Sequence, residues 1–180
     1  MKHALFIILL FAFQLADAQS TIDKVNKYRA QHENAILKEY FSLLSIPNYA
    51  LDKVNIDKNA VFIEAMLKKR GIQTKLLESN TKGSPKAVYG EVIVPGATQT
   101  IIFYAHYDGQ PVSPAKWHPS IKPYQPVLLD QSIEKSGKII AFPTNGQAFN
   151  PEWRISCRSS SDDKAGVMTI INAYDALVKT

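Results

Sequence analysis

The feature that most constrains this chain is the segment "IIFYAHYDGQP", which runs from Ile101 to Pro111. Five consecutive apolar residues lead into a histidine and an aspartate that lie two positions apart. A near-continuous apolar run of this length is typical of a parallel strand that is buried on both faces. We therefore expect Thr100–Ala105 to be the central strand of a sheet, with polar side chains presented where the strand ends.

Helical and strand patterns alternate around this segment. The predicted helices cover residues 21–45, 55–70 and 163–179, and the predicted strands cover residues 72–77, 87–94, 100–105, 127–129 and 138–142. The order favours an α/β fold with a mostly parallel central sheet flanked by helices. The proline-rich segment 111–126 is expected to be an extended loop. The last two strands are expected to form a hairpin, followed by a turn at Pro143-Thr144-Asn145-Gly146.

The first 18 residues have the pattern of a secretory signal peptide. A basic start, Met1-Lys2-His3, precedes an uncharged apolar run over residues 4–13, and Ala16 and Ala18 are small residues that suit a signal peptidase. The run is too short for a permanent membrane span, and no cysteine follows Ala18 to carry a bacterial lipid anchor. We expect an exported protein, periplasmic or secreted, without a stable membrane anchor. A buried N-terminal helix is the alternative.

Composition narrows the class of protein. The chain is 46% hydrophobic and 21% charged, which argues against general disorder. The net charge of +5 is spread along the chain without interleaved aromatic residues, so we expect no nucleic-acid partner. Cys157 is the only cysteine, which excludes an internal disulfide, and we expect it to be a packing residue.

Two polar clusters carry the candidate chemistry. His106 and Asp108 follow the predicted central strand, where ligands bind in open α/β sheets, and residues two apart on an extended chain share a face. A carboxylate beside a histidine fixes the ring for metal binding. The alternative is a strand-end pair that faces water. In the second cluster, "SSDDK", Asp162 and Asp163 either cap the last helix or hold a metal.

Together these motifs resemble a known family. "HYDGQP", Trp117, "KPYQP" and "RSSSDDKAG" are similar, in this order, to motifs of the di-zinc metallopeptidase family twenty, which contains carnosinase-type dipeptidases, aminoacylase and glutamate carboxypeptidase. The dipeptidase branch is the most similar, and the resemblance covers residues 20–180. It implies that His106 is a ligand of one of two zinc ions. It also implies that Asp108 serves catalysis by holding the His106 ring, and that Asp162 bridges both ions beside a cis Asp162–Asp163 peptide.

The chain departs from the family pattern in three places. Cys157-Arg158-Ser159 stands where the family has Gly-Arg-Gly, Ala165 stands where it has a glycine, with Gly166 one position later, and the connection over residues 131–153 is longer. The family's Glu-Glu pair, which supplies the general base and a ligand, does not occur in the sequence. We therefore expect residues 19–180 to be the N-terminal part of a catalytic domain, truncated before the lid domain and the remaining ligands and inactive alone.

Three functions stay open at this level. The first is zinc-dependent hydrolysis of peptide or N-acyl-amino-acid amides by a longer enzyme, which could dimerise only through its lid domain. The second is a degenerate relative that binds peptide or metal without catalysis, and the third is a periplasmic α/β binding protein in which both clusters are structural. Trp117 and Tyr124 are expected to pack within the proline-rich loop, and lining the substrate cleft is the alternative.

Overall fold

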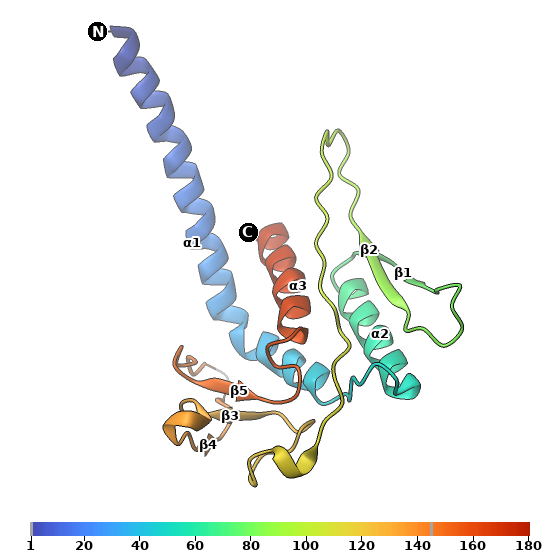
Figure 1. Cartoon of the computed structure of the whole chain (residues 1–180). Helices are drawn as coiled ribbons and strands as arrows, with labels where there is room; N and C mark the ends of the chain where they lie inside the picture. Colours follow the sequence, from blue (N-terminus) through green and yellow to red (C-terminus); the bar gives the residue numbers. More distant parts are fainter. Residues whose placement is uncertain (1, 145) are drawn as a thin grey trace.

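The computed structural model describes residues 2–144 and 146–180, with side chains from Ser20 onward. Within these residues, three helices accompany two small sheets (Figure 1). The helices are α1 (Lys2–Leu44), α2 (Lys53–Lys68) and α3 (Lys164–Lys179), with short 3-10 turns η1 (Pro114–Lys116) and η2 (Ile133–Lys135). The strands are β1 (Gln73–Leu77), β2 (Ala87–Glu91), β3 (Val127–Leu129), β4 (Ile139–Ile140) and β5 (Arg154–Ser156). The predicted α/β class is confirmed.

Local signals explain where α2 and α3 begin and end. The side chain of Asp52 accepts a hydrogen bond from the Asn55 amide, so it caps the first turn of α2. Gly71 follows that helix with φ of +75°, a conformation that favours glycine. The Asp163 side chain accepts from the Gly166 amide and caps α3. These helices agree with the predicted ranges to within two residues, whereas α1 begins well before residue 21.

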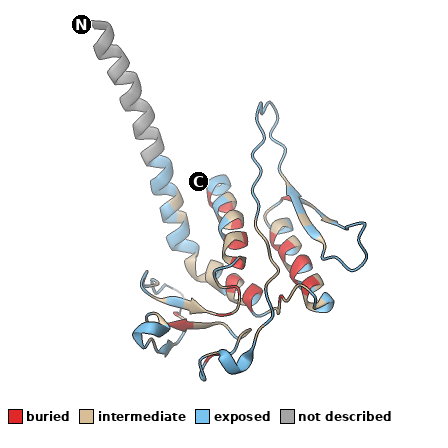
Figure 2. Ribbon diagram, viewed as in Figure 1, coloured by how far each residue is buried: buried red, intermediate tan, exposed pale blue. Residues whose placement is uncertain are grey.

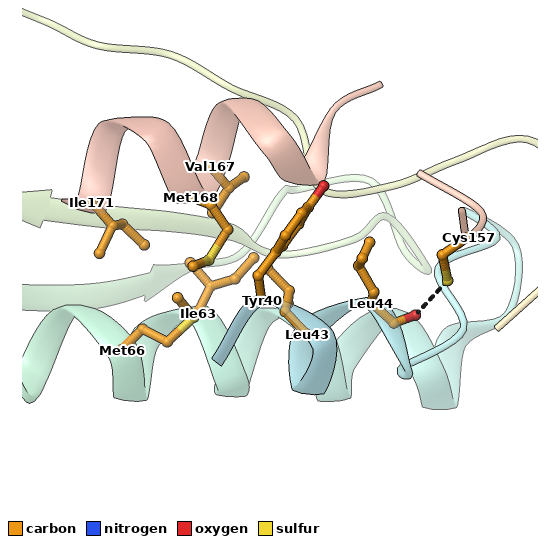
Figure 3. Packing of buried hydrophobic residues seen from close by; sticks show 9 residues of the cluster. All are labelled: Tyr40, Leu43, Leu44, Ile63, Met66, Cys157, Val167, Met168 and Ile171. Carbon is orange, nitrogen blue, oxygen red and sulfur yellow. Dashed lines mark hydrogen bonds between the residues drawn. The ribbon is translucent and has the colours of Figure 1, made fainter. Parts of the chain in front are cut away.

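The core lies where the three helices meet (Figures 2 and 3). Aliphatic and sulfur-containing side chains from α1, α2 and α3 fill it, together with one tyrosine and the cysteine that follows β5. The buried members are Tyr40, Leu43, Leu44, Ile63, Met66, Cys157, Val167, Met168 and Ile171. The predicted packing role of Cys157 agrees with this position. Burial of these side chains stabilises the start of α3 against the end of α1.

Both sheets are antiparallel, which corrects the expectation of a mostly parallel sheet. β1 pairs with β2, and β3 lies between β4 and β5. The segment 100–105 forms no strand among the described residues, and Ile102 and Tyr104 are 87% and 85% exposed. An apolar segment becomes a buried central strand only where strands lie on both of its edges. The described residues place none there, and the segment forms one arm of a long projection (Figure 1).

The structure also tests the predicted hairpin, while part of the predicted turn and the side chains of the predicted signal peptide lie outside the described residues. β3 and β4 form the predicted antiparallel hairpin, while β5 was not predicted. Residue 145 of the predicted turn, Met1, and the side chains of the predicted signal peptide over residues 1–18 lie outside the described residues. No described helix is long and apolar enough to cross a membrane.

The core position of Leu43 gives a first prediction. Leu43 is fully buried between the helices, so Leu43→Ala removes apolar contacts and leaves a cavity. We expect the free energy of unfolding to fall by about 2–5 kcal/mol, measured by urea denaturation. Leu51→Ala, at a side chain that is 79% exposed, is the matched control and should change it by less than about 0.5 kcal/mol. Equal losses in both variants would contradict the core described above.

Candidate functional site

The fold brings the two predicted polar clusters into contact, although they lie 56 positions apart in the sequence. The His106 Nε2 atom lies 2.9 Å from Asp162 Oδ1. On the other side of the ring, His106 Nδ1 lies 3.1 Å from Asp108 Oδ1 and 3.1 Å from the Asp108 carbonyl oxygen. The Asp162 side chain is 89% exposed, so this carboxylate faces solvent as well as the imidazole.

The surroundings of the His106 ring determine what it can bind. Nδ1 has only acceptors of Asp108 around it, so Nδ1 carries a proton and donates it there. In the neutral ring, the lone pair of Nε2 then faces a carboxylate oxygen, an arrangement that requires a proton or a metal cation between the two atoms. Burial lowers the pKa of His106, but hydrogen bonds to Asp162 and Asp108 outweigh burial, so the pKa is raised.

Asp163 has a structural role distinct from that of Asp162. Its Oδ2 atom accepts a hydrogen bond from the backbone amide of His106 at 3.2 Å, and its Oδ1 atom accepts from the Gly166 amide at 3.2 Å. The side chain therefore joins the start of α3 to the end of the segment that carries His106. A Cβ at position 166 would collide with this carboxylate, which explains the glycine there. The peptide bond between Asp162 and Asp163 is cis, as the resemblance implies.

A buried lysine ties this region to α1. Lys164 is fully buried, and its Nζ atom donates to the carbonyl oxygens of Leu43 at 2.8 Å and Ile46 at 2.7 Å. The last carbonyls of a helix have no partner within the helix. The Leu43 carbonyl also accepts from the Ile46 amide at 3.3 Å, so Lys164 adds a shorter bond there and supplies a donor to the carbonyl of Ile46, two residues past the end of α1. Burial lowers the pKa of Lys164 to about 7. A neutral amine keeps two N–H donors, enough for both carbonyls.

The segment that precedes the two aspartates borders an open pocket of about 180 Å³. Its lining residues are Trp117, Cys157, Arg158, Ser159, Ser160, Ser161 and Asp162. Trp117 from the proline-rich loop thus lies beside the candidate site. The Tyr40 hydroxyl donates to the Ser160 carbonyl at 2.8 Å and fixes this segment to α1. Sequence reasoning missed the roles of Tyr40 and Lys164, because no local motif marks a buried hydrogen bond to a distant carbonyl.

His106 and Asp162 carry the kinds of atom that bind zinc, but two side chains are fewer than a zinc site needs. Imidazole nitrogen and carboxylate oxygen are both zinc ligands, and a tightly held ion takes three or four protein ligands. Within the described part of the chain, no three histidine, cysteine, aspartate or glutamate side chains are grouped so that they could hold a metal ion. His106 Nε2 and the Asp162 carboxylate could therefore supply at most two of the ligands that a tight zinc site takes.

Comparison with known proteins gives a likeness in structure. No family model matches the sequence, and no curated protein matches it. The fold is similar to that of the di-peptidase Dug1p from Saccharomyces cerevisiae, with a TM-score of 0.62 and 17% sequence identity. The alignment covers 89% of this chain and 31% of that protein, so the chain spans about a third of its length. At this level of identity the likeness establishes a shared fold.

Burial of the Cys157 thiol predicts low reactivity. Burial raises the pKa of this thiol from 9.0 to about 11, so the thiolate is scarce at pH 8. We expect iodoacetamide to label the native protein at pH 8 far more slowly than the urea-unfolded protein, with label counted by mass spectrometry. The thiol has a higher pKa in the folded protein than in the unfolded one, so its contribution to the free energy of unfolding is complete below pH 9. That contribution is lost as the pH rises towards 11. Rapid native labelling at pH 8 would contradict this burial.

The hydrogen bonds of Lys164 predict a loss of stability on substitution. Lys164→Met keeps the length of the side chain but removes its donors, so the Ile46 carbonyl loses the Lys164 bond and the Leu43 carbonyl keeps its longer bond from the Ile46 amide. We expect the free energy of unfolding to fall by about 1–3 kcal/mol in urea denaturation. The matched control is Lys69→Met, at a side chain that is 73% exposed, for which little change is expected. An unchanged stability for Lys164→Met would show that these bonds contribute nothing net.

Proposed function

We propose that this chain forms part of an exported zinc-dependent hydrolase that cleaves peptide amide bonds in dipeptide-like substrates. The observation that carries the proposal is the contact between His106 and Asp162, with Asp108 against the far side of the imidazole. The site would face solvent beside a pocket that the chain builds from Trp117 and the segment before α3. Export rests on the signal-like pattern of residues 1–18 alone.

The residues of this chain would have three roles at the site: binding zinc, orienting a ligand and fixing the backbone. His106 Nε2 and the Asp162 carboxylate would hold zinc, and Asp108 keeps the imidazole oriented through Nδ1. Asp163 and the α3 N-terminus fix the backbone that carries both ligands. Bound zinc supplies a Lewis acid for the scissile carbonyl and lowers the pKa of water for attack on the amide. The general base and the remaining ligands would come from a longer protein.

The peptide substrate is supported by the shared fold. A solved structure with this fold is described as that of a di-peptidase. N-acyl-amino-acid amides belong to the same chemical class, since the bond cleaved is again an amide. Because the described residues offer only two candidate zinc ligands at this site, a second candidate function is that the chain binds metal without catalysis. Activity measurements separate the two candidates.

Removal of His106 tests the proposal directly. In the 180-residue chain, we expect weak zinc binding, measured by competition with a chromophoric chelator, and no dipeptide hydrolysis. His106→Ala should weaken zinc binding by at least roughly tenfold, equivalent to about 1.4 kcal/mol, because one of two ligands is lost. The protein translated from the full reading frame should hold about two zinc ions per chain and hydrolyse dipeptides.

His32→Ala is the matched control for this test. His32 is an exposed histidine on α1 whose Nδ1 atom contacts the Tyr28 carbonyl, away from the candidate site. Its removal should leave zinc binding unchanged. Equal zinc affinity in His106→Ala and the parent would overturn the metal site. Zinc binding without hydrolysis in the full-frame protein would favour the non-catalytic alternative.

A further inference from the structure

A buried asparagine lies between the two segments that carry the site. Residues 106–109, the histidine loop, follow the exposed arm, and residues 158–163, the aspartate loop, precede α3. Asn48 lies in the turn after α1 and is fully buried. It contacts both loops through its side chain, although the sequence around it contains no motif that points to the site.

Every polar group of the Asn48 side chain is satisfied by these loops. One N–H of Nδ2 donates to the Tyr107 carbonyl oxygen at 2.9 Å in the histidine loop. The other donates to Ser159 Oγ at 2.9 Å in the aspartate loop. The Ser159 hydroxyl in turn donates to Asn48 Oδ1 at 3.3 Å. A backbone bond adds to this, because the Gly109 amide donates to the Asn48 carbonyl at 2.7 Å.

The backbone around Asn48 and Ser159 permits the hydrogen bonds between their side chains. Ser159 is buried and has φ of +63°, a left-handed conformation that costs energy for a residue with a side chain. At Gly109, an added Cβ would lie 2.9 Å from Ser159 Oγ and 3.0 Å from Asn48 Nδ2. Only glycine allows the histidine loop to approach the pair this closely. The aspartate loop therefore reaches Asn48 through a constrained backbone at Ser159, and the histidine loop reaches it through the close approach that Gly109 permits.

We propose that Asn48 and Ser159 are positioning residues that set the distance between His106 and Asp162. The inference rests on the proposed function, since its purpose is to hold two zinc ligands together. Asn48 fixes the Tyr107–Asp108 peptide, one residue beyond His106, and Ser159 lies three residues before Asp162. Asp162 itself is mostly exposed, so packing alone does not hold its carboxylate in place. The hydrogen-bonded pair supplies that constraint from beneath the site.

Two substitutions of Ser159 separate the hydroxyl from the backbone conformation. Ser159→Ala keeps a side chain at positive φ and removes the hydroxyl, while Ser159→Gly removes the hydroxyl and relieves the conformation. In both variants we expect zinc binding to weaken by roughly tenfold, the size of effect seen when a residue that orients a metal ligand is removed. We also expect the His106 amide, which donates to Asp163 across the two loops, to exchange with deuterium roughly tenfold faster by NMR.

Asn59→Ala is the matched control. Asn59 is equally buried, but its Nδ2 donates to the carbonyls of Pro47 and Asn55 and to neither loop. It should lower overall stability while His106 exchange, taken relative to core amides such as Met168, and zinc affinity stay at parent values. The inference is overturned if both Ser159 variants keep parent exchange and affinity, or if Asn59→Ala reproduces their effects.

The two readouts distinguish failure of this inference from failure of the proposed function. If the parent chain binds no zinc, the metal site fails, and faster His106 exchange in the Ser159 variants still supports the positioning role. If the parent binds zinc and the Ser159 variants bind it equally well with unchanged exchange, the metal site stands and the positioning role is wrong. Asn48→Ala adds a third variant, expected to match the Ser159 variants in both readouts.

Discussion

The hydrogen bonds from Lys164 to the carbonyls of Leu43, at the end of α1, and of Ile46, in the turn that follows, are the constraint on which the rest of the structure depends. They join the end of one helix to the start of another across more than a hundred residues, in a place that water does not reach. The apolar contacts between α1, α2 and α3 are not directional, so they hold the helices together without fixing their ends. The directional hydrogen bonds of the buried Lys164 amine fix the start of α3 against the end of α1. Asp162 and Asp163 directly precede Lys164, so these bonds also fix their position.

The candidate site is built on this junction by polar groups that satisfy one another. Tyr40 holds the Ser160 carbonyl, Asp163 holds the His106 amide, and Asn48 holds both loops. Buried polar groups are costly when they lack partners, so each of these bonds also disfavours alternative positions of the loops. The side chains of His106 and Asp162 can therefore remain partly exposed to solvent while the backbone that carries them is held firmly.

The features that sequence alone predicted are those with local causes. The extents of α2 and α3, the acidic cap of α3 and the β3–β4 hairpin depend on residues close in the chain. The segment 100–105 was predicted wrongly as a buried strand, because burial depends on neighbours that its own residues do not encode. The candidate ligands His106 and Asp162, and Asp108 beside the His106 ring, came from two motifs and a family resemblance, and the structure brings the three side chains together. Asn48 and Lys164 gave no local signal, since their partners lie far away in the sequence.

The exposed arm that was expected to be a central strand has a consequence for the behaviour of the chain in solution. Its large apolar side chains lie in water, and no other described strand pairs with its backbone. Extended apolar segments with free edges are templates for intermolecular pairing, which natural proteins suppress with charges, proline or a covering element. Residues 101–104 carry none of these protections. Self-association of this chain should therefore begin at the arm while the helical core stays folded.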